Sequence, residues 1–227
     1  MKTSKKDKKD EDNSKEKMKN SIIEYGKKIF DKYLDNRNFN AEKAPSWQES
    51  IIDEILNFCT KNYSNYNFFI ISFLSSHSTS YNSSANGNFI DKTDNFFSFN
   101  NGSDSNFHIE VRIFYFINKL IPKDNYNLIE NKIIKKNVEI NKKILDDRKY
   151  SFDSCSKYIN SLTMELTDYI LKIDKSRYYY CIIYLYNNKI KDWFVNFKYE
   201  GTKPINSKIV HVYTGANIEG ISYIFSW

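Results

Sequence analysis

The chain has 227 residues, of which 41% are hydrophobic and 17% aromatic, so it carries enough apolar material to bury a core. Its formal charge is +6, and residues 1–18 supply +2 of it (seven Lys against five acidic residues); the remaining +4 is spread too thinly to predict a nucleic-acid-binding surface. Three cysteines argue against a disulfide framework, and no apolar run approaches the ~20 residues of a membrane helix.

Residues 1–18 mix positive and negative charges and contain almost no apolar side chains. Such a segment cannot bury enough surface to offset the entropy lost on ordering, so we expect a disordered tail. It also lacks the apolar stretch of a signal peptide, and the chain is expected to be cytoplasmic.

Two helices are predicted next. The first, residues 19–36, has a broad apolar face. The second begins near Pro45, which is tolerated in a first turn because its missing N–H has no helical partner there. Apolar residues then recur at helical period, and we expect four of them to form a helix–sheet core: Trp47, Ile51, Ile55 and Phe58.

Strands follow the helices. Phe68–Leu74 is apolar at every position but one, which is typical of a strand covered on both faces. The Ser- and Asn-rich residues 75–88 are expected to form a loop. Further strands are predicted near Phe96–Phe99 and over Ile109–Phe116, where alternation with polar residues indicates a half-exposed strand.

The sequence repeats itself at an offset of 111 residues. Leu34–Phe39 matches Leu145–Tyr150 without a gap, and the match continues through the helix and strand that follow. Such an offset predicts two copies of one unit, residues 19–116 and 132–227, joined by a linker over 117–131. The core positions of the second copy are then Tyr158, Leu162, Leu166 and Tyr169.

The second copy is expected to contain helices over 132–147 and 154–172 and strands over 178–187, 193–199, 208–213 and 218–227. The alternating strand pattern of Trp193–Tyr199 has no counterpart in Asn82–Asn88. Either one copy has drifted here or the two copies use this strand differently. Each unit is therefore two helices packed on an antiparallel sheet, an α+β fold.

Residues that carry chemistry are scattered. The Cys and His positions are 59, 77, 108, 155, 181 and 211, with no two closer than 18 residues, so no zinc-type spacing exists. Gly215–Gly220 lacks the Lys and Ser/Thr of a phosphate-binding loop. We expect neither an enzyme nor a site for a metal, a cofactor or a small-molecule substrate. A small α+β unit of this kind often binds an extended peptide along a sheet edge.

A family resemblance appears along the first copy. The segment Phe39–Trp47, with Ile51, Ile52, Asp53 and Leu56, resembles the second helix of the Tctex-type dynein light chains, and Tyr66–Ser72 is similar to their first strand. The elements Phe89–Asp91, Thr93–Asp94 and Phe99–Asn101 are similar to further elements of that family.

This resemblance implies a non-catalytic adaptor with a homodimeric fold of two helices packed on a sheet, in which one strand is exchanged between subunits. It implies as partners a dynein intermediate chain, other light chains and cargo proteins with disordered segments, and a place in a cytoplasmic or axonemal dynein complex. A tandem copy could build the family's dimer inside one chain, as an intramolecular pseudodimer. The expected peptide-binding residues are Phe96, Phe97, Ser98 and Phe99.

Two other functions stay open at this point. The segment Ser46–Ser50, which precedes an amphipathic helix, suggests a resemblance to an actin-filament capping subunit. That function would require a long amphipathic helix near the last residues of this chain. The basic tail alternatively favours an RNA- or membrane-associated protein.

Overall fold

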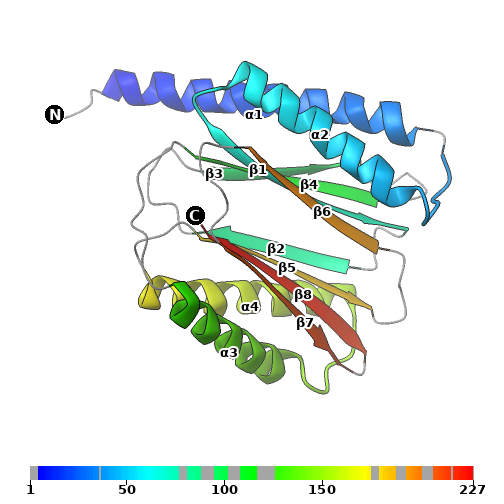
Figure 1. The fold of residues 1–227 in the computed structure, drawn as a ribbon, viewed down its shortest axis with the longest axis vertical. Coiled ribbons are helices and arrows are strands. Elements are labelled where there is room, and N and C mark those ends of the chain that lie inside the picture. Colours follow the sequence, from blue (N-terminus) through cyan, green and yellow to red (C-terminus); the bar gives the residue numbers. More distant parts are fainter. Residues whose placement is uncertain are drawn as a thin grey trace. The chain divides into compact units, whose positions relative to one another are not determined.

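The computed structural model describes residues 5–35, 37–76, 81–87, 95–101, 108–116, 126–174, 179–187, 193–200, 207–215 and 217–226. In chain order the elements are α1 (Lys5–Leu34), α2 (Ala44–Asn62), β1 (Asn67–Ser75), β2 (Tyr81–Gly87), β3 (Asn95–Asn100), β4 (His108–Phe116), α3 (Tyr126–Leu145), α4 (Phe152–Ile173), β5 (Tyr179–Asn187), β6 (Trp193–Glu200), β7 (Ser207–Thr214) and β8 (Ile218–Ser226). The predicted α+β class is confirmed (Figure 1).

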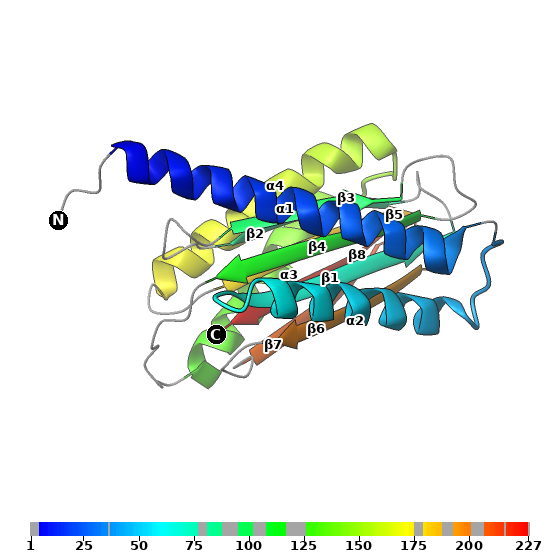
Figure 2. The same cartoon turned by 90° about the horizontal axis from the view of Figure 1, so that it is seen from above.

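The chain divides into two compact units. The first contains an antiparallel sheet in the order β3-β4-β1-β6, and α1 and α2 cover one face of it (Figure 2). Helix α1 lies over β3, and α2 lies over β1 and β6. The second unit contains the antiparallel sheet β2-β5-β8-β7 with α3 packed on β7 and α4 on β2 and β5. Taken from the other edge, the second sheet reads β7-β8-β5-β2, so that each strand corresponds to one of β3-β4-β1-β6 and the borrowed strand comes last in both units.

Each unit borrows one strand from the other half of the sequence. Strand β6 pairs with β1 in the first unit, with Ile71 opposite Phe197, while β2 pairs with β5 in the second, with Ser84 opposite Ile183. Lys198 on the borrowed β6 donates to Glu49 and Asp53 of α2 at 3.3 and 3.2 Å. In this structure both borrowed strands belong to the same chain as the sheets that they complete.

Strand β1 is buried at every position, which confirms the prediction of a strand covered on both faces. Strand β4 was expected to be half-exposed, and this is wrong: every residue after His108 is buried. Its polar residues pair instead of facing solvent, since the Arg112 Nε donates to a Glu110 carboxylate oxygen at 2.8 Å. A buried charge needs such a partner, because an unpaired one is strongly penalised.

Three expected boundaries are wrong. The loop expected over 75–88 contains β2, a strand of small polar residues. The tail expected to be disordered over 1–18 belongs to α1 from Lys5 onward. Extending an existing helix costs little free energy once the turns that follow are packed, and Met18 of these turns lies in the core. Helix α3 begins at Tyr126, inside the expected linker 117–131, whose residues 117–125 lie outside the described part of the chain.

Side-chain contacts recur at the 111-residue offset. Lys32 pairs with Glu54 between α1 and α2, and Lys143 pairs with Glu165 between α3 and α4. Likewise Arg37 lies over the Trp47 ring, at 5.5 Å from its centroid, and Arg148 lies over the Tyr158 ring at 5.7 Å. Salt bridges as exposed as these contribute little to stability by themselves. Their recurrence indicates that both helix pairs use the same packing.

We predict that Ile55→Ala and Leu166→Ala each lower the free energy of unfolding by about 2–5 kcal/mol, because both side chains are buried in a core and truncation leaves a cavity. Chemical denaturation followed by circular dichroism measures the change. Lys61→Ala and Lys172→Ala, exposed on the same two helices, are the matched controls and should shift it by no more than about 0.5 kcal/mol. Equal effects from core and surface variants would contradict the assignment of the cores.

Candidate functional site

Strand β3 forms one edge of the first sheet, since among the described strands it pairs with β4 alone. The orientation of its backbone follows from its last contact. The Asn101 N–H donates to the Ile109 carbonyl at 3.3 Å, and the Ile109 N–H donates to the Asn101 Oδ1 at 3.0 Å. In an antiparallel pair, backbone groups point toward and away from the partner at alternate residues. The N–H and C=O groups of Phe96, Ser98 and Asn100 therefore point away from β4, toward the outer side of the sheet edge.

The four residues predicted to bind a peptide all lie on β3, but they face different surroundings. Phe99 is buried, with 7% of its surface exposed, and Phe97 packs partly against the same core. Phe96 stacks on Phe114 with ring centroids 5.5 Å apart. Ser98 is exposed. A partner along this edge would meet backbone groups and the Ser98 side chain, while Phe99 acts from inside by fixing the strand.

Phe99 is held against α1 by a close helix–strand approach. Its ring lies 5.4 Å from the Phe30 ring, centroid to centroid, and it fills the space beside Gly26. A Cβ atom added at Gly26 would lie 2.3 Å from the Phe99 Cε2, far inside van der Waals contact. Glycine is costly in a helix interior, by about 1 kcal/mol relative to Ala, so its presence here reflects the need for room.

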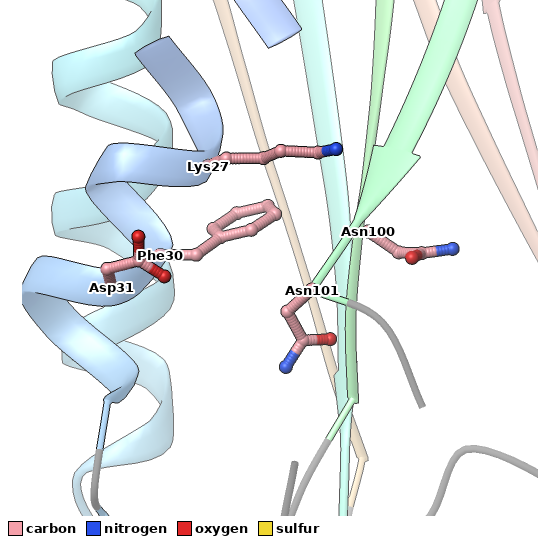
Figure 3. A pocket seen from close by; sticks show the side chains of 5 residues that line it. All are labelled: Lys27, Phe30, Asp31, Asn100 and Asn101. Atoms are coloured by element: carbon pink, nitrogen blue, oxygen red, sulfur yellow. The ribbon is translucent and has the colours of Figure 1, made fainter. Parts of the chain in front are cut away.

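A surface hollow of about 350 Å³ opens where the end of β3 meets α1. It is lined by Lys27, Phe30, Asp31, Asn100 and Asn101 (Figure 3). In Figure 3 Lys27 and Phe30 extend from the helix toward the strand, and Asn101 lies across from them. The hollow combines one aromatic floor residue with a cationic, an anionic and two amide side chains, a set suited to a polar peptide and without a nucleophile.

Sequence reasoning placed the site on β3 but missed its α1 side. Gly26, Lys27, Phe30 and Asp31 lie within a helix whose apolar face offered no sign of a functional role. One available signal was Gly26 itself, because a glycine inside a helical pattern usually has a packing reason.

The predicted helix–sheet core residues lie as follows. Ile51, Ile55, Leu162 and Leu166 are at most 1% exposed. The four aromatic residues are partly buried: Trp47 and Phe58 pack against the first core and Tyr158 against the second, while Tyr169 lies under the Lys136 ammonium, which is 5.9 Å from its ring centroid.

Reactive chemistry is not evident in the described residues. Burial raises the pKa of both the Cys59 and the Cys181 thiols to about 12, which keeps them protonated and unreactive at neutral pH. Within the described ranges no group of three or more His, Cys, Asp or Glu residues could hold a metal ion. Among the described residues, too, no helix is long and apolar enough to cross a membrane. His77 lies outside the described residues.

Residues 16–116 match the Tctex-1 family, and this span runs from α1 to the end of β4. No curated protein and no solved structure matches the chain.

We predict that Gly26→Ala destabilises the protein by up to about 2.5 kcal/mol. The added methyl group gains about 0.5–1 kcal/mol of helix propensity, but overpacking against the Phe99 ring costs about 1–3 kcal/mol. Chemical denaturation tests this.

The Phe99→Ala background provides the control. With the ring removed, Gly26→Ala should stabilise the protein by about 0.5–1 kcal/mol, so the two substitutions couple strongly in a double-mutant cycle. Additive effects would mean that α1 and β3 are not packed as described.

Proposed function

Because residues 16–116 belong to the Tctex-1 family, a family of non-catalytic dynein light chains, we propose that this protein is an adaptor that binds an extended segment of a dynein intermediate chain or of a cargo protein. The segment adds to the open edge of β3 as a further strand. This role supports the assembly of a microtubule motor or its transport of cargo, with the protein in a cytoplasmic or an axonemal dynein complex.

The open edge of β3 is the observation that carries the proposal. Phe96, Ser98 and Asn100 direct their backbone groups outward, which provides a ladder for main-chain hydrogen bonds. The hollow formed by Lys27, Phe30 and Asp31 lies at the end of that ladder and can receive side chains of the partner. Affinity then comes from the backbone and specificity from the hollow.

We also propose that the two units form an intramolecular pseudodimer of two Tctex-like domains. The exchange of β2 and β6, the shared order of elements and the salt bridges at the 111-residue offset support this arrangement. Linking the two domains makes their association independent of protein concentration.

Neither of the other functions considered from the sequence has a specific observation in its favour. Residues 218–226 form β8, whereas the actin-capping alternative required an amphipathic helix there. The basic segment on which an RNA- or membrane-associated role would depend continues α1 from Lys5.

The first test concerns the edge of β3. Ser98→Pro removes an outward N–H without removing a hydrogen bond to β4, so it should weaken binding of an intermediate-chain peptide about tenfold and leave the fold intact. Isothermal titration calorimetry measures the affinity. Ser98→Ala keeps the N–H and is the control, with unchanged binding expected. Full affinity in a folded Ser98→Pro variant would move the site away from β3.

The second test concerns the pseudodimer. Light scattering coupled to gel filtration should give the mass of one 27.0 kDa chain at every protein concentration. A dimer whose fraction grows with concentration would show that strands are exchanged between chains, and the intramolecular arrangement would have to be abandoned.

A further inference from the structure

The two units differ at one set of corresponding positions. In the first unit α1 and the edge strand β3 meet through apolar contacts: Gly26 gives room to Phe99, whose ring packs on Phe30, and Val111 of β4 lies opposite Phe99 in the register. Phe30, Phe99 and Val111 all belong to the buried core.

Polar residues occupy the corresponding positions of the second unit. The 111-residue offset takes Gly26, Phe30 and Val111 to Asn137, Asn141 and Ser222. The residue opposite Ser222 on the edge strand β7, in the place of Phe99, is His211. All four positions have changed from glycine or apolar to polar, and they do so together.

Three of these residues, Asn137, Asn141 and Ser222, form a buried hydrogen-bonded cluster between α3 and β8, and the half-buried His211 of β7 lies opposite Ser222. Asn137 and Asn141 are each 1% exposed and Ser222 is 2% exposed. The Asn141 Nδ2 donates to the Asn137 Oδ1 at 2.7 Å, and the Ser222 Oγ donates to the same oxygen at 3.4 Å. At these four positions, two buried nitrogens have no partner among the described residues: the Asn137 Nδ2 and the His211 Nδ1.

His211 faces the helix side of its sheet, as do its neighbours Ile209 and Tyr213, which pack in or against the second core. From β8 it faces Ser222, which does not titrate. On the α3 side the cluster residues are the uncharged Asn137 and Asn141. The charged groups of α3 that contact other residues do so elsewhere: Lys136 with Glu139, and Lys143 with Glu165. Beyond the end of α3, Asp146 accepts the Tyr213 hydroxyl at 2.9 Å.

A charge on His211 would therefore be costly. Burial lowers its pKa below the ordinary value, and none of the carboxylates that the structure describes offsets this effect. The buried His211 Nδ1 has no hydrogen-bond partner within the described part of the chain, so an N–H that protonation adds there would lack an acceptor.

We propose that the contact between α3 and β7 is a proton-sensitive latch, in which protonation of His211 separates the β7 edge from α3 while the apolar contact between α1 and β3 stays closed. The sheet edge of the second unit thus opens in mildly acidic solution, and that of the first unit does not. This device is independent of the partner proposed above.

The direction follows from proton linkage. A histidine whose pKa is lower in the closed state binds its proton more tightly in the open state. The closed state is therefore most stable above the unperturbed histidine pKa of about 6.5, and it loses stability as the pH falls below that value. Between the two pKa values, the opening equilibrium increases by up to about tenfold per pH unit.

Hydrogen exchange of the full chain at pH 7.5 and 5.5, corrected for the intrinsic pH dependence of amide exchange, tests the latch. We expect amides of β7 to lose protection at the lower pH, by up to about tenfold in the opening equilibrium, and amides of β3 to keep theirs. His211→Gln should remove the difference, and His108→Gln, on β4 of the first unit, should retain it.

Unchanged protection of β7, an equal change in β3, or a pH effect that persists in His211→Gln would each overturn the proposal. Titration of the histidine ring protons of the unmodified protein by NMR gives an independent reading. His211 should titrate below about 6.5, and a value at or above this would refute the latch even if the His211→Gln variant did not fold.

Discussion

The fold depends on a pairing requirement of two central strands. Strands β1 and β5 are buried along almost their whole length and need a hydrogen-bonded neighbour on both sides. Each half of the sequence supplies only one of those neighbours, β4 for β1 and β8 for β5. The second neighbour comes from the other half, as β6 and β2. Without the exchange, an apolar strand would be left as an open edge in both units.

The helices and most strands could be predicted because their apolar residues recur at the spacing that places them on a buried face. The stripe from Trp47 to Phe58 and its counterpart from Tyr158 to Tyr169 both occur on helices. Strand β2 could not be predicted, because Tyr81–Gly87 contains small polar residues with little strand propensity. Its conformation is imposed by pairing with the buried β5, a tertiary effect that overrides local preference. For β4 the sequence predicted too much exposure, because Glu110 and Arg112 are charged. Their pairing with each other lets both lie in a buried strand.

The candidate site was only half visible in the sequence for a related reason. Alternating aromatic residues mark β3 as a strand, but its position at an edge follows from the sheet order, which no local pattern encodes. The contribution of α1 depends on a helix brought close to that edge by Gly26. In the second unit Asn137 stands at the position of Gly26 and His211 at that of Phe99, so two similar frameworks present edges of different chemical character.

The exchanged strand β6 also sets an order for biosynthesis. Ile71 of β1 is paired with Phe197, 126 positions later in the chain (197 − 71), and such non-local pairings form slowly because a long loop must close first. During translation, β1 emerges from the ribosome with β4 as its only available neighbour until residues 193–200 have been made. The nascent chain therefore carries an apolar strand with one unpaired edge until β6 has been made, and this interval is when it depends most on chaperones.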